Sequence, residues 1–143
     1  MQLSADLDDP LVVAGGPAGM RRILYARRGA FSGSRLRGVL LPGGGDWVLQ
    51  RSDGVAELDI RFVLRTHDAQ LIYVTCDGVF DISPEHRERI RTGGEVDPSE
   101  YYFRTAPLFE TASDKYAWLN RILAVGIGRR MPGQVGYAVY AIR

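Results

Sequence analysis

The sequence predicts a mainly β fold: a small antiparallel β-barrel, closed or nearly closed, with one or two short helices. The clearest evidence is residues 56–66, where Leu58, Ile60, Phe62 and Leu64 alternate with polar residues at the period of two typical of a half-buried strand. Turn signals divide the chain into about nine or ten short strands, a spacing that suits a barrel or a sandwich. A barrel would leave no open sheet edge and would enclose a cavity.

The length of 143 residues suits one domain with its own core, so we expect residues 1–143 to form a single barrel domain. Residues 1–10 are expected to form a loose N-terminal arm, and Leu11-Val12-Val13 to pair with a neighbouring strand. The next expected strands cover residues 23–33, 36–41 and 46–51. A hairpin turn at Ser52-Asp53-Gly54 then leads into the strand 56–66.

The second half of the chain continues this pattern and adds the helices. His67-Asp68-Ala69-Gln70 predicts a turn into the strand 71–75, and Asp77-Gly78 predicts another turn. Ser83 suits the N-cap of a short helix, with Pro84 at its first position and an end at Gly93-Gly94.

Further strands are expected from residue 101, over residues 122–128 and over residues 135–142. The last two are joined by a hairpin at Met131-Pro132-Gly133-Gln134. Between them and the strand from residue 101, Ser113-Asp114 predicts the cap of one helical turn.

Composition excludes several classes of protein. The net charge of +1 argues against nucleic-acid binding, and no apolar run approaches the ~20 residues that cross a bilayer. The start of the chain has no signal-peptide pattern, so we expect a cytoplasmic protein in which the one cysteine, Cys76, is a buried thiol. Six arginines crowd one stretch of the chain: Arg21, Arg22, Arg27, Arg28, Arg35 and Arg37. Solvated strand faces are the favoured interpretation, and a site for an anionic ligand or an acidic partner is the alternative.

The segment Leu41-Pro42-Gly43-Gly44-Gly45-Asp46-Trp47 carries the strongest functional signal. Its glycines allow a sharp bend or a close approach of the backbone to another group. Asp46 is either a turn residue that binds local amides or a general acid or base with a raised pKa at the mouth of a barrel. Trp47 is correspondingly a core residue or a flat surface on which a substrate stacks.

Other candidate site residues have equally open alternatives. Arg61 either faces solvent in an ion pair with Asp59, which is the favoured interpretation, or faces the interior. Tyr73 is either a packing residue with a solvated hydroxyl, again the favoured interpretation, or a proton donor. Inside the barrel both would join Asp46 as catalytic residues by stabilising an oxyanion. The candidate substrate-binding residues are Trp47, Tyr102, Arg104, Tyr116, Trp118 and Asn120. Tyr116, Trp118 and Asn120 plug one end of the barrel, contact a ligand there, or do both. The motifs indicate no metal site and no cofactor, because His67 and His86 lie apart and no phosphate-binding glycine motif is present.

Taken in order, these motifs resemble the DUF3237 family, also called UPF0311. The matching segments include 29–33, 36–47, 59–61, 101–105 and 116–120, and they extend over nearly the whole chain from Arg22 onward. One departure is Asp68-Ala69-Gln70, where the family usually has Asp-Gly-Ala. The resemblance implies a small barrel of the calycin-like kind that self-associates as a dimer or a larger homo-oligomer, and it assigns no chemistry.

The first functional hypothesis is an enzyme that works without a cofactor on a small, largely apolar or aromatic oxygenated metabolite. The reaction would be an isomerisation, cyclisation or elimination, with Asp46 as acid or base. Arg61, Tyr73 and Asn120 would stabilise negative charge, and Trp47 and Trp118 would supply apolar walls. The alternatives are a non-catalytic binding or carrier protein for a hydrophobic small molecule and a protein-interaction module.

Overall fold

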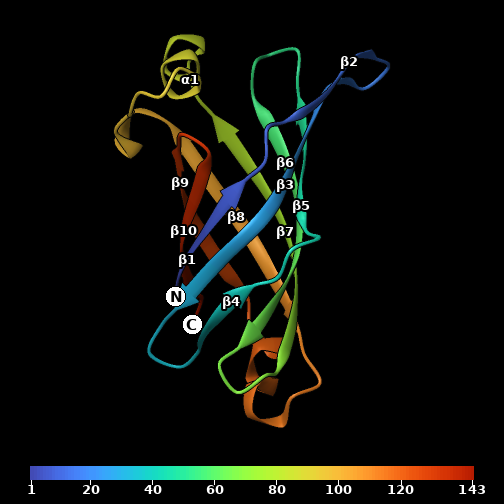
Figure 1. Cartoon of the computed structure of the whole chain (residues 1–143), viewed down its shortest axis with the longest axis vertical. Coiled ribbons are helices and arrows are strands. Elements are labelled where there is room, and N and C mark those ends of the chain that lie inside the picture. The colour runs from blue at the N-terminus through green and yellow to red at the C-terminus, as the bar shows by residue number, and fades with distance from the viewer.

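The computed structural model describes residues 1–143, whose strands wrap around one interior as a closed antiparallel barrel (Figure 1). The strands are β1 (Gln2–Leu7), β2 (Leu11–Gly16), β3 (Gly19–Ser32), β4 (Arg37–Leu40), β5 (Gly45–Gln50), β6 (Ala56–Thr66), β7 (Leu71–Asp81), β8 (Tyr102–Glu110), β9 (Ala124–Met131) and β10 (Gln134–Ala141). The helices are α1 (Pro84–Arg91) and the 3-10 helices η1 (Pro98–Glu100) and η2 (Asp114–Arg121). The predicted β-barrel is confirmed.

Strand β1 closes the barrel because it pairs with β10 on one side and β3 on the other. Leu3 lies opposite Tyr137 of β10 and Phe31 of β3, and both Leu3 and Ala5 are buried. The prediction of a loose arm over residues 1–10 is therefore wrong for Gln2–Leu7. Its short alternation of apolar and polar residues is a strand signal that the interpretation of an arm overlooked.

One position in the wall is shared by two short strands. The long strand β3 pairs with β5 through its first half and with β4 through its second half, and both partners also pair with β6. The expected pairing of Leu11-Val12-Val13 is confirmed, since β2 forms a hairpin with the start of β3. This hairpin extends beyond the upper end of the barrel (Figure 1).

The core follows from the alternation in β6. Leu58, Ile60 and Leu64 are buried inside the barrel with Ile72 and Val74 of the neighbouring β7. The polar residues between them on β6 lie on the outer face, as the period of two predicts.

The upper end of the barrel carries α1 (Figure 1). Ser83 caps this helix as predicted, because its Oγ accepts a hydrogen bond of 3.1 Å from the backbone N–H of His86. Gly93, with φ of 91°, follows the end of the helix. Ile90 is the buried residue of α1, so one apolar side chain anchors an otherwise charged helix. None of the helices has the length and apolar character needed to cross a bilayer.

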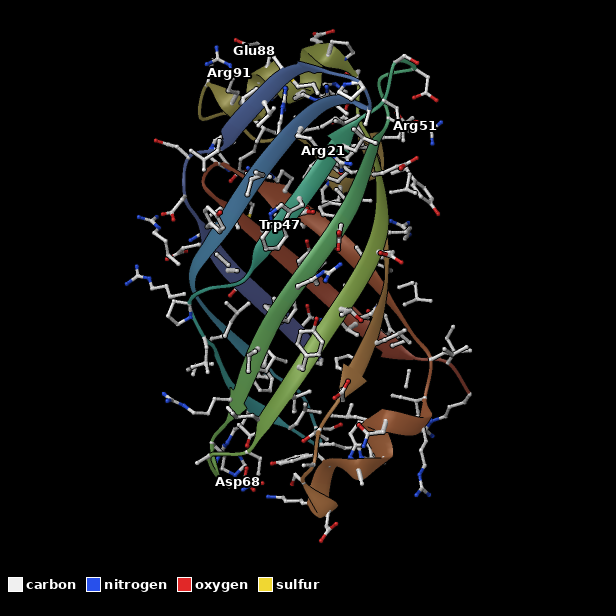
Figure 2. The ribbon with its side chains drawn as sticks, turned by 90° about the vertical axis from the view of Figure 1, so that its right-hand side faces the viewer. Arg21, Trp47, Arg51, Asp68, Glu88 and Arg91 are labelled. Carbon is white, nitrogen blue, oxygen red and sulfur yellow. The ribbon has the colours of Figure 1, made fainter.

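The lower end is closed by η2, which the Asp68 carboxylate ties to the β6–β7 turn (Figure 2). Asp68 accepts hydrogen bonds from Thr66 Oγ1 at 2.6 Å, Lys115 Nζ at 2.6 Å and Tyr116 Oη at 2.9 Å. These donors, led by Lys115, hold the pKa of Asp68 well below its usual range. Because Tyr116 and Leu119 are buried, the structure supports the interpretation of this segment as a plug.

Two local predictions are wrong. Asp77-Gly78 forms no turn, because β7 continues to Asp81, and Gly78 instead allows close packing: an added Cβ would lie 2.8 Å from Cγ2 of Thr105. Ser113 makes no side-chain cap on η2. Its carbonyl accepts from the Tyr116 N–H, so the backbone alone begins this 3-10 helix.

The predicted turn at 67–70 contains the chain's one non-glycine residue with positive φ, Ala69 at 62°. Because an L-residue with a Cβ is strained there, we expect Ala69→Gly to raise the free energy of unfolding by about 1 kcal/mol. Urea denaturation measures this change. Ala30→Gly on β3 is the matched control and should lower stability by roughly 0.5–1 kcal/mol. Equal destabilisation by both substitutions would contradict strain at Ala69.

Candidate functional site

A cavity of about 660 Å³ occupies the upper part of the barrel interior. Its wall is largely apolar and includes Leu24, Val48, Leu58, Ile60, Phe80 and Phe103. Exposed residues of the β1–β2 connection, α1 and the β9–β10 turn form its rim, so the cavity opens to solvent beside α1. A mostly apolar cavity of this size with a few polar groups is typical of a small-molecule site.

Asp46 reaches this cavity because of the glycines that precede it. Gly43 has a φ of 102°, which turns the chain out of β4. At Gly44 an added Cβ would clash with the carbonyl oxygen of Arg61, and at Gly45 it would lie 2.7 Å from that of Leu24. The glycines thus let β5 enter between β3 and β6, with Asp46 on the inner face.

The Asp46 carboxylate replaces part of the hydrogen-bonded ladder between β5 and β6. Trp47 and Val48 have no partner on β6, and the backbone N–H of Asp59 donates to Asp46 Oδ1 at 3.1 Å instead. At this point the hydrogen bonding between β5 and β6 therefore depends on the Asp46 side chain. The bond also fixes the direction of the carboxyl group beside the cavity.

Burial raises the pKa of Asp46 from 3.8 to about 7. The nearby Asp59 carboxylate also raises this pKa. The Asp59 N–H and the Arg130 charge lower it, but the loss of bulk water outweighs these two. The side chain keeps some accessible surface because it borders the cavity. A carboxyl group with this pKa can both accept and donate a proton near neutral pH.

Arg130 and Tyr137 border the same cavity. Arg130 Nη1 donates to the carbonyl oxygens of Met131 at 3.0 Å and Gln134 at 2.5 Å, which fixes the guanidinium at the β9–β10 turn. Burial lowers the pKa of Arg130 and raises that of Tyr137 well above its usual value. The phenol is therefore a neutral hydrogen-bond donor, and the guanidinium remains a cation near Asp46.

Four of the predicted site residues gather elsewhere, on the outer wall. Trp47, Arg61, Tyr102 and Arg104 line a shallow hollow there, and Figure 2 shows Trp47 on this outer face. Trp47 meets Tyr25 edge to face with ring centroids 6.2 Å apart, and Arg104 lies over the Tyr102 ring at 5.1 Å.

Arg61 and Tyr73 are therefore separated from Asp46 by the wall of the barrel. Arg61 forms an exposed ion pair with Asp59, with Nε and Oδ1 3.2 Å apart, and Tyr73 is also exposed. The favoured outward position of Arg61 is confirmed, and the hypothesis that Arg61 and Tyr73 act beside Asp46 in one hollow is wrong. On a strand, neighbours of inward-facing residues face outward, and Ile60, Ile72 and Val74 take the inward positions.

The remaining candidates lie at the lower end, away from Asp46. Trp118 stacks under the Arg35 guanidinium, whose Cζ is 3.6 Å from the ring centroid. Asn120 binds the backbone of Thr111 twice, through Oδ1 and Nδ2, each at 2.9 Å. Tyr116 binds Asp68. These contacts support the plug, and none of the three residues lines the cavity that Asp46 borders.

Sequence reasoning missed Arg130 and Tyr137. The sequence did carry one signal on β9, where the small residues Ala124, Gly126 and Gly128 alternate with larger ones. The structure buries these small residues, and the same alternation places Arg130 on the inner face. No group of three or more His, Cys, Asp or Glu side chains is arranged to hold a metal ion. Cys76 is buried, as predicted, and burial raises its pKa to about 11.

The sequence and the structure of this chain are both similar to those of known proteins. A UPF0311 protein from Clostridium acetobutylicum is 35% identical over 98% of this chain and 89% of its own length. A crystal structure of a beta-barrel like protein from Acinetobacter baumannii is 38% identical, covers 99% of this chain and 92% of its own, and superposes with a TM-score of 0.85.

A more distant protein resembles this chain in its fold alone. The crystal structure of a protein from Penicillium herquei, described as an enzyme, is 20% identical over 98% of this chain and 90% of its own, with a TM-score of 0.68.

The model of the family described as "Protein of unknown function (DUF3237)" matches residues 1–142. With its sequence resemblance and its barrel in agreement, the chain belongs to the DUF3237 family.

Proposed function

We propose that this protein is an enzyme that, without a cofactor, moves a proton on a mainly apolar or aromatic oxygenated metabolite held in the barrel. The observation that carries the proposal is the Asp46 carboxyl group at the wall of an apolar cavity, with a pKa of about 7. A general acid or base acts best when its pKa lies near the working pH. Isomerisation, cyclisation and elimination are the reaction types that need such a group.

The other polar groups of the cavity take the supporting roles. Tyr137 would donate a hydrogen bond to a substrate oxygen, and Arg130 would stabilise the negative charge that develops there. They replace Arg61, Tyr73 and Asn120, which lie away from the cavity. Phe80 and Phe103 replace the two tryptophans as the aromatic walls, with ring centroids 4.7 Å apart.

The second candidate is a carrier that binds the same kind of molecule and leaves it unchanged. The observation in its favour is the preponderance of apolar residues in the cavity wall. The two functions differ in one result: an enzyme alters the bound metabolite, whereas a carrier releases it intact.

The proposal also takes the protein to be a homo-oligomer in the cytoplasm. Support for self-association comes from exposed apolar side chains on the outer face of β8, where Tyr102 and Leu108 are 53% and 52% exposed. Light scattering combined with size-exclusion chromatography would give the number of subunits.

Asp46→Asn tests the catalytic role. We would incubate the protein with a small-molecule extract of its own cells in D2O and search by mass spectrometry for metabolites that gain deuterium or change structure. Because the carboxamide of the variant cannot transfer a proton, the rate of any such change should fall by a factor of about 10²–10⁴. Asp77→Asn on the exposed outer face of β7 is the matched control and should keep the normal rate.

Equal rates in wild type and Asp46→Asn would remove Asp46 from the mechanism. A metabolite that wild type binds and returns without any exchange or rearrangement would favour the carrier.

The pKa of Asp46 also predicts how stability depends on pH. Between pH 3.8 and about 7 the folded protein retains a proton that the unfolded chain has lost, so the free energy of unfolding falls as pH rises through this window. The loss attributable to Asp46 is about 4 kcal/mol at most. Asp46→Asn lacks this titration and should therefore gain stability over wild type as pH rises from about 4 to about 8. Parallel stability curves, measured by urea denaturation, would contradict a raised pKa.

A further inference from the structure

Two arginines lie at the mouth of the cavity and lack carboxylate partners. Arg22 lies on the inner face of β3 between Met20 and Leu24, and Arg87 reaches the mouth from α1. Neither takes part in any ion pair of the chain. Arg87 Nη2 donates one hydrogen bond, to the carbonyl oxygen of Gly54 at 3.1 Å.

None of the carboxylates near the mouth forms an ion pair with Arg22 or Arg87. The carboxylate of Asp8 is engaged by Arg27, and that of Glu88 by Arg91. Asp9 is exposed on the rim. Burial, and then the like charge of Arg22, lower the pKa of Arg87, and these two effects outweigh the nearby Asp81 carboxylate, which raises it. The two guanidiniums therefore oppose each other electrostatically.

An arrangement of this kind is unfavourable for an empty barrel, because half-buried cations need an opposite charge or hydrogen-bond acceptors. An anionic group at the mouth would supply both. Of the six arginines clustered near the N-terminus, Arg22 is the one that lines the cavity. The others lie on exposed positions, so the solvated interpretation holds for them and the anion-site interpretation suits Arg22.

We propose that Arg22 and Arg87 bind the carboxylate of an amphipathic acid whose apolar body fills the barrel. A carboxylate matches the flat fork of a guanidinium, and the cavity wall below is apolar. The inference rests on the proposed function in one respect, namely that the cavity holds a ligand. It adds the substrate class: a long-chain or aromatic carboxylic acid.

The strand register relates this anchor to Asp46. Arg22 lies opposite Val48 on β5, and Asp46 lies two residues further into the barrel, about 7 Å along the strand. A substrate bound by its carboxylate at the mouth would therefore present a carbon several bonds away to Asp46. The anchor would position the molecule without taking part in the proton transfer.

Competition with a fluorescent probe tests the anchor. The uncharged dye N-phenyl-1-naphthylamine would occupy the cavity and would then be displaced by dodecanoate or by 1-dodecanol, which share a chain length and differ in charge. The variants are Arg22→Gln and Arg87→Gln. The controls are Arg21→Gln, on the outer face of the same strand (Figure 2), and Arg89→Gln, an exposed residue of α1.

We expect wild type to bind dodecanoate about tenfold more tightly than 1-dodecanol at about pH 8. Arg22→Gln and Arg87→Gln should each weaken dodecanoate binding about tenfold. Both variants should bind the dye and the alcohol as wild type does, which also shows that they fold. Arg21→Gln and Arg89→Gln should leave the affinities for dodecanoate and for 1-dodecanol unchanged.

Equal affinity for dodecanoate and 1-dodecanol would overturn the anchor while leaving ligand binding in the cavity intact. The same conclusion would follow if Arg21→Gln weakened dodecanoate binding as much as Arg22→Gln. If the dye, the acid and the alcohol all failed to bind wild type, both the anchor and the proposed function would fall.

Discussion

The central constraint in this molecule is the burial of one carboxyl group in the wall of the barrel. Asp46 accepts the backbone N–H of Asp59 at a point where β5 and β6 do not pair, so the wall itself holds the side chain in place. Close backbone contacts at Gly44 and Gly45 bring β5 to this position. The same burial that disfavours the ionised form in the folded protein places its pKa in the range useful for catalysis.

The rest of the barrel makes this burial possible. Pairing of β1 with both β3 and β10 closes the sheet, and η2, held by Asp68, closes the lower end. The upper end stays open beside α1, so a molecule can enter while apolar walls surround it. The resulting site is polar at two levels, with arginines at the mouth and the Asp46 carboxyl group and the Tyr137 phenol deeper inside. This division suits a ligand with one charged end and one reactive region.

The sequence predicted the parts of the molecule that depend on local patterns. The alternation in β6, the Ser83 cap and Asp46 beside its glycines could all be inferred from neighbouring residues. The site as a whole depends on which side chains face inward, and there the prediction was wrong. Asp46 and Trp47 cannot share one hollow, because consecutive residues of a strand face opposite ways. Arg130 and Tyr137 carry no motif, and only the barrel's closure brings β9 and β10 near β5. The likeness of Tyr116-Trp118-Asn120 to a pocket lining came from composition, whereas their hydrogen bonds and packing are those of a plug.

The most direct test is to measure the ionisation of Asp46 itself. The ¹³C chemical shift of its side-chain carboxyl carbon would be followed by NMR from about pH 3 to about pH 9, with the signal assigned by its loss in Asp46→Asn. We expect a single titration with a midpoint near pH 7. A midpoint near 3.8, the value of a solvated aspartate, would show that the barrel does not withdraw this group from water and would remove the basis of the proposed chemistry.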